Sequence, residues 1–97
     1  MKIQFSSKFK DDLLVADTYY FRISNRLGSE FHERIKETIR TVVRFGGGDH
    51  IGAHGYKARK AEPFPYIVYY ESDGEDLNII ALVHERRHPD FLKQNQT

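Results

Sequence analysis

Apolar residues recur at steps of three and four along two neighbouring stretches of the chain, which predicts two amphipathic helices. Ser6 or Ser7 is placed to cap the first helix, and Ser24-Asn25-Arg26 separates it from the second. The glycines at 46–48 end the second helix. Because the link between the helices is short, we expect an antiparallel hairpin. The apolar positions are Phe9, Leu13, Ala16, Tyr20 and Ile23 in the first helix and Leu27, Phe31, Ile35, Ile39 and Val42 in the second.

Elsewhere the pattern changes to a period of two or to short runs rich in aromatic and β-branched residues, which predicts strands. Lys2 to Phe5 forms a short first strand, and three more follow the glycine-rich loop, with Asp73-Gly74 marking a tight hairpin turn between the last two. These three are expected at Tyr56 to Ala61, Tyr66 to Glu71 and Leu77 to His84. The order β-α-α-β-β-β predicts an α+β fold in which the helix hairpin packs on one face of a small, mostly antiparallel sheet. We expect a single domain over residues 1–97 with a short C-terminal tail at 89–97.

The last two strands are apolar on both faces, whereas one helix hairpin covers only one face. Strict alternation places Leu77, Ile79, Ala81 and Val83 on one side, and Ile80, Leu82 and His84 on the other. We therefore expect a partner protein to cover the second face, unless the sheet curls and shields itself or the tail covers part of it through Phe91 and Leu92. The residues predicted to bind this partner are Ile67, Tyr69, Ile80 and Leu82.

Composition narrows the classes of function. The 97 residues carry a net charge of only +1, which disfavours sequence-specific binding to DNA. There is no cysteine, no apolar run long enough to span a membrane and no signal-peptide pattern, so we expect a cytoplasmic protein without a membrane role. His50 and His54 lie in a glycine-rich loop without further ligands nearby, so neither a metal nor another cofactor is expected.

Two basic runs remain as candidate chemistry: Lys57-Ala58-Arg59-Lys60 and Arg86-Arg87-His88. Each is also compatible with a solvated strand or tail, and Arg86 or Arg87 could pair with Glu85 or Asp90.

The order of several short motifs resembles the ParE branch of the RelE/ParE toxins. The matching segments are "GSEFHERIKETIRTVVRF" at 28–45 and "YKARKAEPFPYIVYYESDGEDLNIIALVHERRHP" at 56–89. They contain Gly28 with Phe31, the basic strand, Phe64-Pro65-Tyr66 followed by Ile67 to Tyr70, and a last strand running into His84-Glu85-Arg86-Arg87-His88-Pro89. The resemblance runs from about residue 13 to residue 92 and implies the helix-hairpin-on-sheet fold predicted above.

The resemblance implies the toxin of a type II toxin–antitoxin pair, such as those that stabilise plasmids, with a small antitoxin as its partner. ParE-like members poison DNA gyrase, whereas RelE-like members cut messenger RNA on the ribosome. RNA cleavage needs an acid, a base and cations around the phosphate. This chain offers Lys57, Arg59, His84, Arg86 and His88 for that purpose.

The position about six residues after Arg86 holds Leu92, which is unable to transfer a proton, and this departure disfavours the nuclease. The first hypothesis is therefore a gyrase inhibitor that acts by binding, without catalytic residues, through Arg59, Arg86 and Arg87. The alternatives are a ribosome-dependent mRNA endoribonuclease and a toxin-fold protein that is no longer toxic and acts only in an antitoxin complex.

Overall fold

The computed structural model describes residues 2–46, 49, 51 and 55–86. Its elements are β1 (Lys2–Phe5), α1 (Ser7–Ile23), α2 (Asn25–Phe45), β2 (Lys57–Lys60), β3 (Tyr66–Asp73) and β4 (Asp76–His84). The predicted α+β order is confirmed. Expectations that concern His50, His54, Arg87, His88 and the tail at 89–97 lie outside the described residues.

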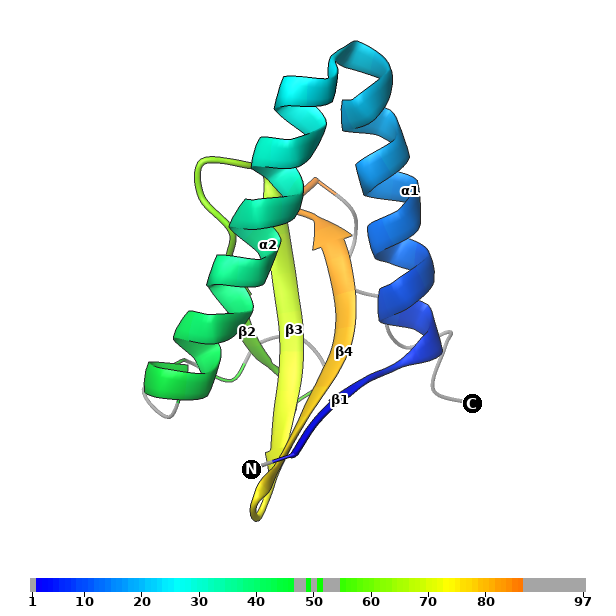
Figure 1. Cartoon of the computed structure of the whole chain (residues 1–97). Coiled ribbons are helices and arrows are strands. Elements are labelled where there is room, and N and C mark those ends of the chain that lie inside the picture. Colours follow the sequence, from blue (N-terminus) through cyan, green and yellow to red (C-terminus); the bar gives the residue numbers. More distant parts are fainter. Residues whose placement is uncertain (1, 47–48, 50, 52–54, 87–97) are drawn as a thin grey trace.

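The four strands form one sheet in the order β1-β4-β3-β2. β1 runs parallel to β4, while β4, β3 and β2 are joined antiparallel, so the sheet is mostly antiparallel as predicted. The helix hairpin lies on one face of this sheet (Figure 1). β1 is the first strand of the sequence and pairs with β4, the last one. None of the described helices is both long and apolar enough to cross a membrane.

Serine side chains begin both helices. The Ser6 hydroxyl accepts a hydrogen bond from the backbone N–H of Phe9 at 2.9 Å, and the Ser24 hydroxyl accepts one from Leu27 at 3.0 Å. Each bond satisfies a donor that the first turn of a helix otherwise leaves open. Ser24 also closes α1, because its own N–H donates to the carbonyl of Tyr20 at 3.2 Å. A single residue therefore ends one helix and caps the next, which gives the hairpin its tight turn.

The core lies between the helix hairpin and the sheet. Its largest fully buried side chains are Phe31, Ile35, Val68, Tyr70 and Ile79. At one end, the Tyr20 ring stacks on Phe31 with centroids 4.5 Å apart, and Phe64 meets both rings edge-on. The two predicted helical stripes supply most of the helical side of this core.

Gly28 allows the two helices to approach. A Cβ atom at this position would lie 2.3 Å from Cγ of Phe21, which is far inside van der Waals contact. The ring of Phe21 on α1 therefore occupies the space that any larger residue at position 28 would fill.

A β-bulge reverses the alternation of β4. Tyr69 pairs with Ala81 and Tyr70 with Ile79, so Ile80 is an extra residue without a partner in β3. Leu82 consequently joins Leu77 and Ile79 in the core under the helices, with 4% of its surface exposed.

The prediction that Leu82 shares the second face with Ile67, Tyr69 and Ile80 is therefore wrong. His84 follows Leu82 onto the helix side, where its ring meets that of Tyr66. Ala81 and Val83 move the other way and lie on the second face, which strict alternation did not predict.

The second face carries a smaller apolar cluster. Tyr69, Ala81 and Val83 are buried in it, and Ile67 and Ile80 pack against them while remaining partly exposed. Three of the four residues predicted for this face are thus present.

Candidate functional site

A groove of about 440 Å³ separates α1 from the end of β4. It combines an apolar floor with two aspartates on one wall and a histidine and an arginine on the other. Its lining residues are Asp11, Asp12, Val15, Ala16, Tyr66, Leu82, Val83, His84 and Arg86. Two of the predicted functional residues, His84 and Arg86, therefore lie in one groove.

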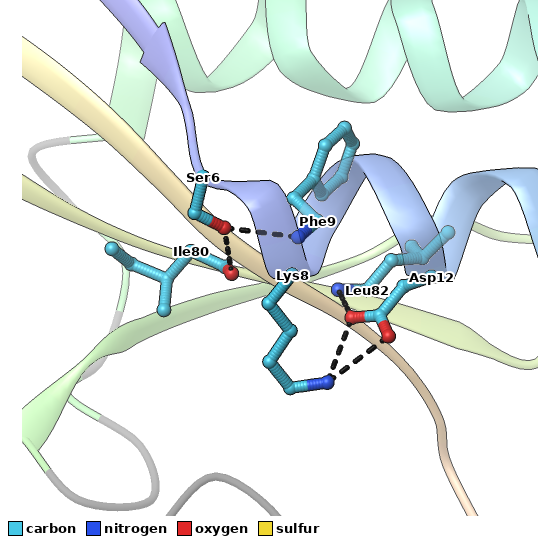
Figure 2. A network of polar contacts seen from close by, with 6 residues as sticks. All are labelled: Ser6, Lys8, Phe9, Asp12, Ile80 and Leu82. Carbon is cyan, nitrogen blue, oxygen red and sulfur yellow. Dashed lines mark hydrogen bonds and ion pairs between the residues drawn. The ribbon is translucent and has the colours of Figure 1, made fainter. Parts of the chain in front are cut away.

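The side chains of Ser6, which caps α1, and of Asp12 within α1 close the edge of β4 beyond the point where β1 ends (Figure 2). β1 pairs with β4 only as far as Ile79. The Ser6 hydroxyl then donates to the carbonyl oxygen of Ile80 at 2.5 Å, and the carboxylate of Asp12 accepts from the N–H of Leu82 at 3.0 Å. Lys8 holds the same carboxylate at 3.0 Å. These contacts take the place of a neighbouring strand on an edge that would otherwise expose its backbone groups.

At the mouth of the groove, His84 is fixed by the turn that follows β4. The backbone N–H of Arg86 donates to Nδ1 of His84 at 3.1 Å, so Nδ1 is unprotonated and the imidazole proton sits on Nε2. The N–H of Glu85 donates to the carbonyl oxygen of Pro65 at 2.9 Å and holds the turn against β3. The arrangement presents Nε2–H and the exposed Arg86 side chain as hydrogen-bond donors at the strand end.

Arg59 lies on β2 and is held by a carboxylate. Its Nη2 atom lies 2.6 Å from Oδ1 of Asp49 and its Nε atom lies 3.1 Å from Oδ2, so the ion pair is bidentate. The Tyr70 hydroxyl also donates to this carboxylate and lies 3.0 Å from the carbonyl oxygen of Gly46. The ion pair is largely buried, with 29% of the Arg59 side chain and 13% of the Asp49 side chain exposed.

This cluster shifts the pKa values of its members. Burial acts to raise the pKa of Asp49, but hydrogen bonds from Arg59 and Tyr70 and the nearby positive charges outweigh burial and bring the pKa below its usual 3.8. Burial, followed by the hydrogen bond to Asp49, raises the pKa of Tyr70 well above its ordinary value. The hydrogen bond with Asp49 raises the pKa of Arg59. Arg59 is therefore a permanent cation whose charge is already matched inside the molecule.

The other two basic residues of β2, Lys60 and Lys57, also interact with carboxylates. Lys60 forms an ion pair with Glu85 at 2.9 Å, and this contact raises the pKa of Lys60. Glu85 thus pairs with Lys60 and not with Arg86, its neighbour in sequence. Lys57 is partly buried on β2, where its charge helps to lower the pKa of Asp49.

Among the candidate nuclease residues that the structure describes, Arg59 lies apart from His84 and Arg86. Arg59 lines a separate hollow of about 320 Å³ beside α2, together with Lys60 and Glu37, whereas His84 and Arg86 line the groove beside α1. Among the described residues, no group of three or more histidines, cysteines or carboxylates is arranged to hold a metal ion.

Two residues that shape these sites were missed in the sequence. The sequence analysis predicted neither the hydrogen bond of Asp12 to the edge of β4 nor the ion pair of Asp49 in the glycine-rich loop. Pairing at such sequence separations has no local signal, although an isolated aspartate between glycines and before a basic strand is a reasonable candidate for an ion pair.

The described elements thus form an α+β fold in which a helix hairpin covers one face of a mixed sheet of order β1-β4-β3-β2. The chain has a ParE-like toxin fold. It superposes with a TM-score of 0.75 on a chain of the solved structure titled "Chromosomal ParDE TA system from P. aeruginosa". The two chains are 16% identical, and the match covers 87% of this chain and 95% of the other. No family model matches the sequence, and no curated protein is similar to it.

Proposed function

We propose that this chain is the toxin of a type II toxin–antitoxin pair and that it inhibits DNA gyrase in the cytoplasm by binding to it. The ParE-like fold supports the toxin assignment, and so does the motif order from Gly28 to Pro89. The similar solved structure belongs, by its title, to a ParDE toxin–antitoxin system. A fold alone serves many functions, so the choice between binding and catalysis depends on the site.

The observation that favours binding is the separation of the candidate catalytic groups. Cleavage of RNA requires a base, an acid and an available cation within reach of one phosphate. Arg59 is held by Asp49 and lies in a different hollow from His84. The groove that holds His84 and Arg86 also carries the exposed carboxylate of Asp11, whose charge repels a phosphate backbone.

The antitoxin is proposed to cover the second face of the sheet around Ile67, Tyr69 and Ile80. Ile67 and Ile80 are partly exposed there and adjoin the buried Tyr69. Leu82 is removed from this surface because it belongs to the core.

Two assays with purified protein separate the candidate activities. Inhibition of gyrase-catalysed supercoiling, without cleavage of mRNA during translation in vitro, is the expected result. Cleavage at codons without gyrase inhibition would establish the nuclease alternative. Failure of both, with retained antitoxin binding, would indicate a toxin fold that is no longer toxic.

A series of variants tests the mechanism through growth arrest after induction. For a binding mechanism, Arg86→Ala and Arg87→Ala should each weaken the effect by degrees, because a charged, desolvated contact contributes about 1–3 kcal/mol. His84→Gln and His88→Gln should be mild. For RNA cleavage, loss of an acid or base should instead lower the rate by roughly 100- to 10,000-fold.

Arg59→Ala requires a stability measurement beside the growth assay, because Arg59 also neutralises the largely buried Asp49. The other variants are compared by circular dichroism to show that each is folded. Abolished toxicity in a folded His84→Gln or His88→Gln chain, with all three arginine variants still toxic, would refute binding as the mechanism.

A further inference from the structure

α1 is apolar on the side that faces away from the core. Leu14, Val15 and Tyr19 are 66%, 69% and 60% exposed. The exposed side of α2, in contrast, is covered by ion pairs between residues three or four positions apart, such as Arg26 with Glu30 and Arg40 with Glu37. A helix that is apolar on opposite sides is normally buried on both. The outward side of α1 is therefore suited to a protein partner.

The charged residues of α1 divide into two groups. Asp12 pairs with Lys8, and Asp17 lies 2.8 Å from His32 on α2, so these carboxylates are used inside the molecule. Lys10, Asp11 and Arg22 are exposed, and none of them forms an ion pair within the described part of the chain. Asp11 and Arg22 stand near opposite ends of the outward side and carry opposite charges.

These residues share one line along the helix. Asp11, Val15, Thr18 and Arg22 are separated by steps of four, three and four, the spacing of a helix–helix seam. Leu14 and Tyr19 flank the line. The Thr18 hydroxyl donates to the carbonyl oxygen of Leu14 at 2.8 Å, so its hydrogen bond is already satisfied and its methyl group can be buried.

We propose that this seam is a contact with a second copy of the same chain, whose α1 packs antiparallel to the first. A two-fold axis between positions 16 and 17 places Asp11 opposite Arg22 of the second copy, and Arg22 opposite its Asp11. The same axis places Val15 opposite Thr18. On one flank of the seam it brings Leu14 beside Leu14 of the second copy, and on the other flank Tyr19 beside Tyr19. Each exposed side chain of the seam thus meets a complementary one.

A second copy fits this surface because the order of charges is self-complementary only when one helix is reversed. The distance from Asp11 to Arg22 is about 16 Å along the axis, so both ion pairs form when two such helices cross at the usual shallow angle of about 20°. Figure 1 shows α1 at the margin of the molecule, with α2 beside it and its other side not covered by a described helix or strand. Two-fold symmetry is also the commonest arrangement of identical subunits.

The contact is small, because each subunit contributes one helix. Interfaces below about 1,200 Å² are typical of weak or transient complexes. We therefore expect a reversible dimer whose proportion rises with protein concentration.

The experiment is a charge exchange, read by sedimentation velocity over a concentration series of the whole chain. Asp11→Arg and Arg22→Asp each replace two attractions with two repulsions, and each should raise the dimer dissociation constant roughly tenfold or more. The double variant Asp11→Arg/Arg22→Asp should dimerise like the wild type. An equimolar mixture of the two single variants should form heterodimers, since every Arg then faces an Asp.

Arg44→Asp serves as the matched control, because Arg44 is also the basic residue in the last turn of its helix but lies on α2. It should leave the dimer unchanged. Circular dichroism of each variant shows that the charge changes have not unfolded α1. The expected result is loss of the dimer in the single variants and recovery of the dimer in the double variant and in the mixture.

Two outcomes would overturn the proposal. The first is a wild-type chain that stays monomeric at every concentration. If the single variants then also fail to bind the antitoxin, the seam is a contact with the antitoxin. The second is a dimer whose dissociation constant is unchanged by the charge exchange, which would place the contact elsewhere. Neither depends on toxicity or on gyrase, so the proposed function and the seam can fail separately.

Discussion

Replacing Asp12 with alanine should weaken the whole domain, although the residue is outside the apolar core. Its carboxylate is the only acceptor shown for the N–H of Leu82 among the described residues, and it also pairs with Lys8 (Figure 2). A buried donor left without an acceptor costs about 1–3 kcal/mol. The ion pair adds to this, because both side chains are about 15% exposed and thus weakly screened by solvent.

We expect Asp12→Ala to lower the free energy of unfolding by about 2–3 kcal/mol, or the melting temperature by roughly 10–20 °C for a domain of this size. Asp12→Asn keeps an oxygen that accepts from Leu82 but loses the charge facing Lys8, so it should cost only about 1 kcal/mol. Asp11→Ala removes an exposed carboxylate one residue away and should change stability by less than about 0.5 kcal/mol.

Urea unfolding followed by circular dichroism measures these differences, at a protein concentration low enough to keep the chain monomeric. Hydrogen exchange adds a local measurement, because the amide of Leu82 should lose more protection in Asp12→Ala than amides at the centre of β3. An Asp12→Ala chain as stable as Asp11→Ala would refute the assignment of an edge-closing role to this carboxylate.

Three further predictions concern the core and the ion pair of β2. Because the pKa of Asp49 is lower in the folded chain than in the unfolded chain, its contribution to stability is present at neutral pH and is lost as the pH falls through the folded-state pKa. Acid titration of the melting temperature should therefore be shallower in Asp49→Asn than in the wild type, and equal slopes would contradict this. Leu82→Asp should unfold the chain, whereas Ile80→Asp should remain folded and lose the antitoxin in a pull-down. Gly28→Ala should lower the melting temperature, since overpacking against Phe21 costs about 1–3 kcal/mol and the gain in helix propensity is about 1 kcal/mol.

Local patterns predicted the helices and the turn well. The stripes of both helices supply buried residues, and Ser6 caps α1 as expected. The Asp73-Gly74 signal corresponds to a two-residue turn, in which Asp73 pairs with Asp76 and Gly74 adopts a φ of 62°. Each of these features depends on residues within a few positions of one another, which is why the sequence alone was sufficient.

The errors arose where distant segments meet. Nothing in the apolar run from Ile79 to Val83 indicates a bulge at Ile80, because every residue there suits a buried strand on either face. The bulge moved Leu82 from a predicted binding surface into the core. In the same way, Arg59 looked available for a target because its partner, Asp49, lies ten positions away across a loop.

The parallel pairing of β1 with β4 has a consequence for the order in which the domain forms. Ile3 lies beside Leu77, so the first strand made by the ribosome has no partner until the last strand has emerged. The helix hairpin can form earlier, because its contacts are local, but its apolar stripe stays uncovered until β3 and β4 arrive. A nascent chain that stops before Asp76 therefore lacks β4, the central strand that joins β1 to β3. We expect such fragments to be captured by chaperones, and the domain to close in one late step once β4 is available.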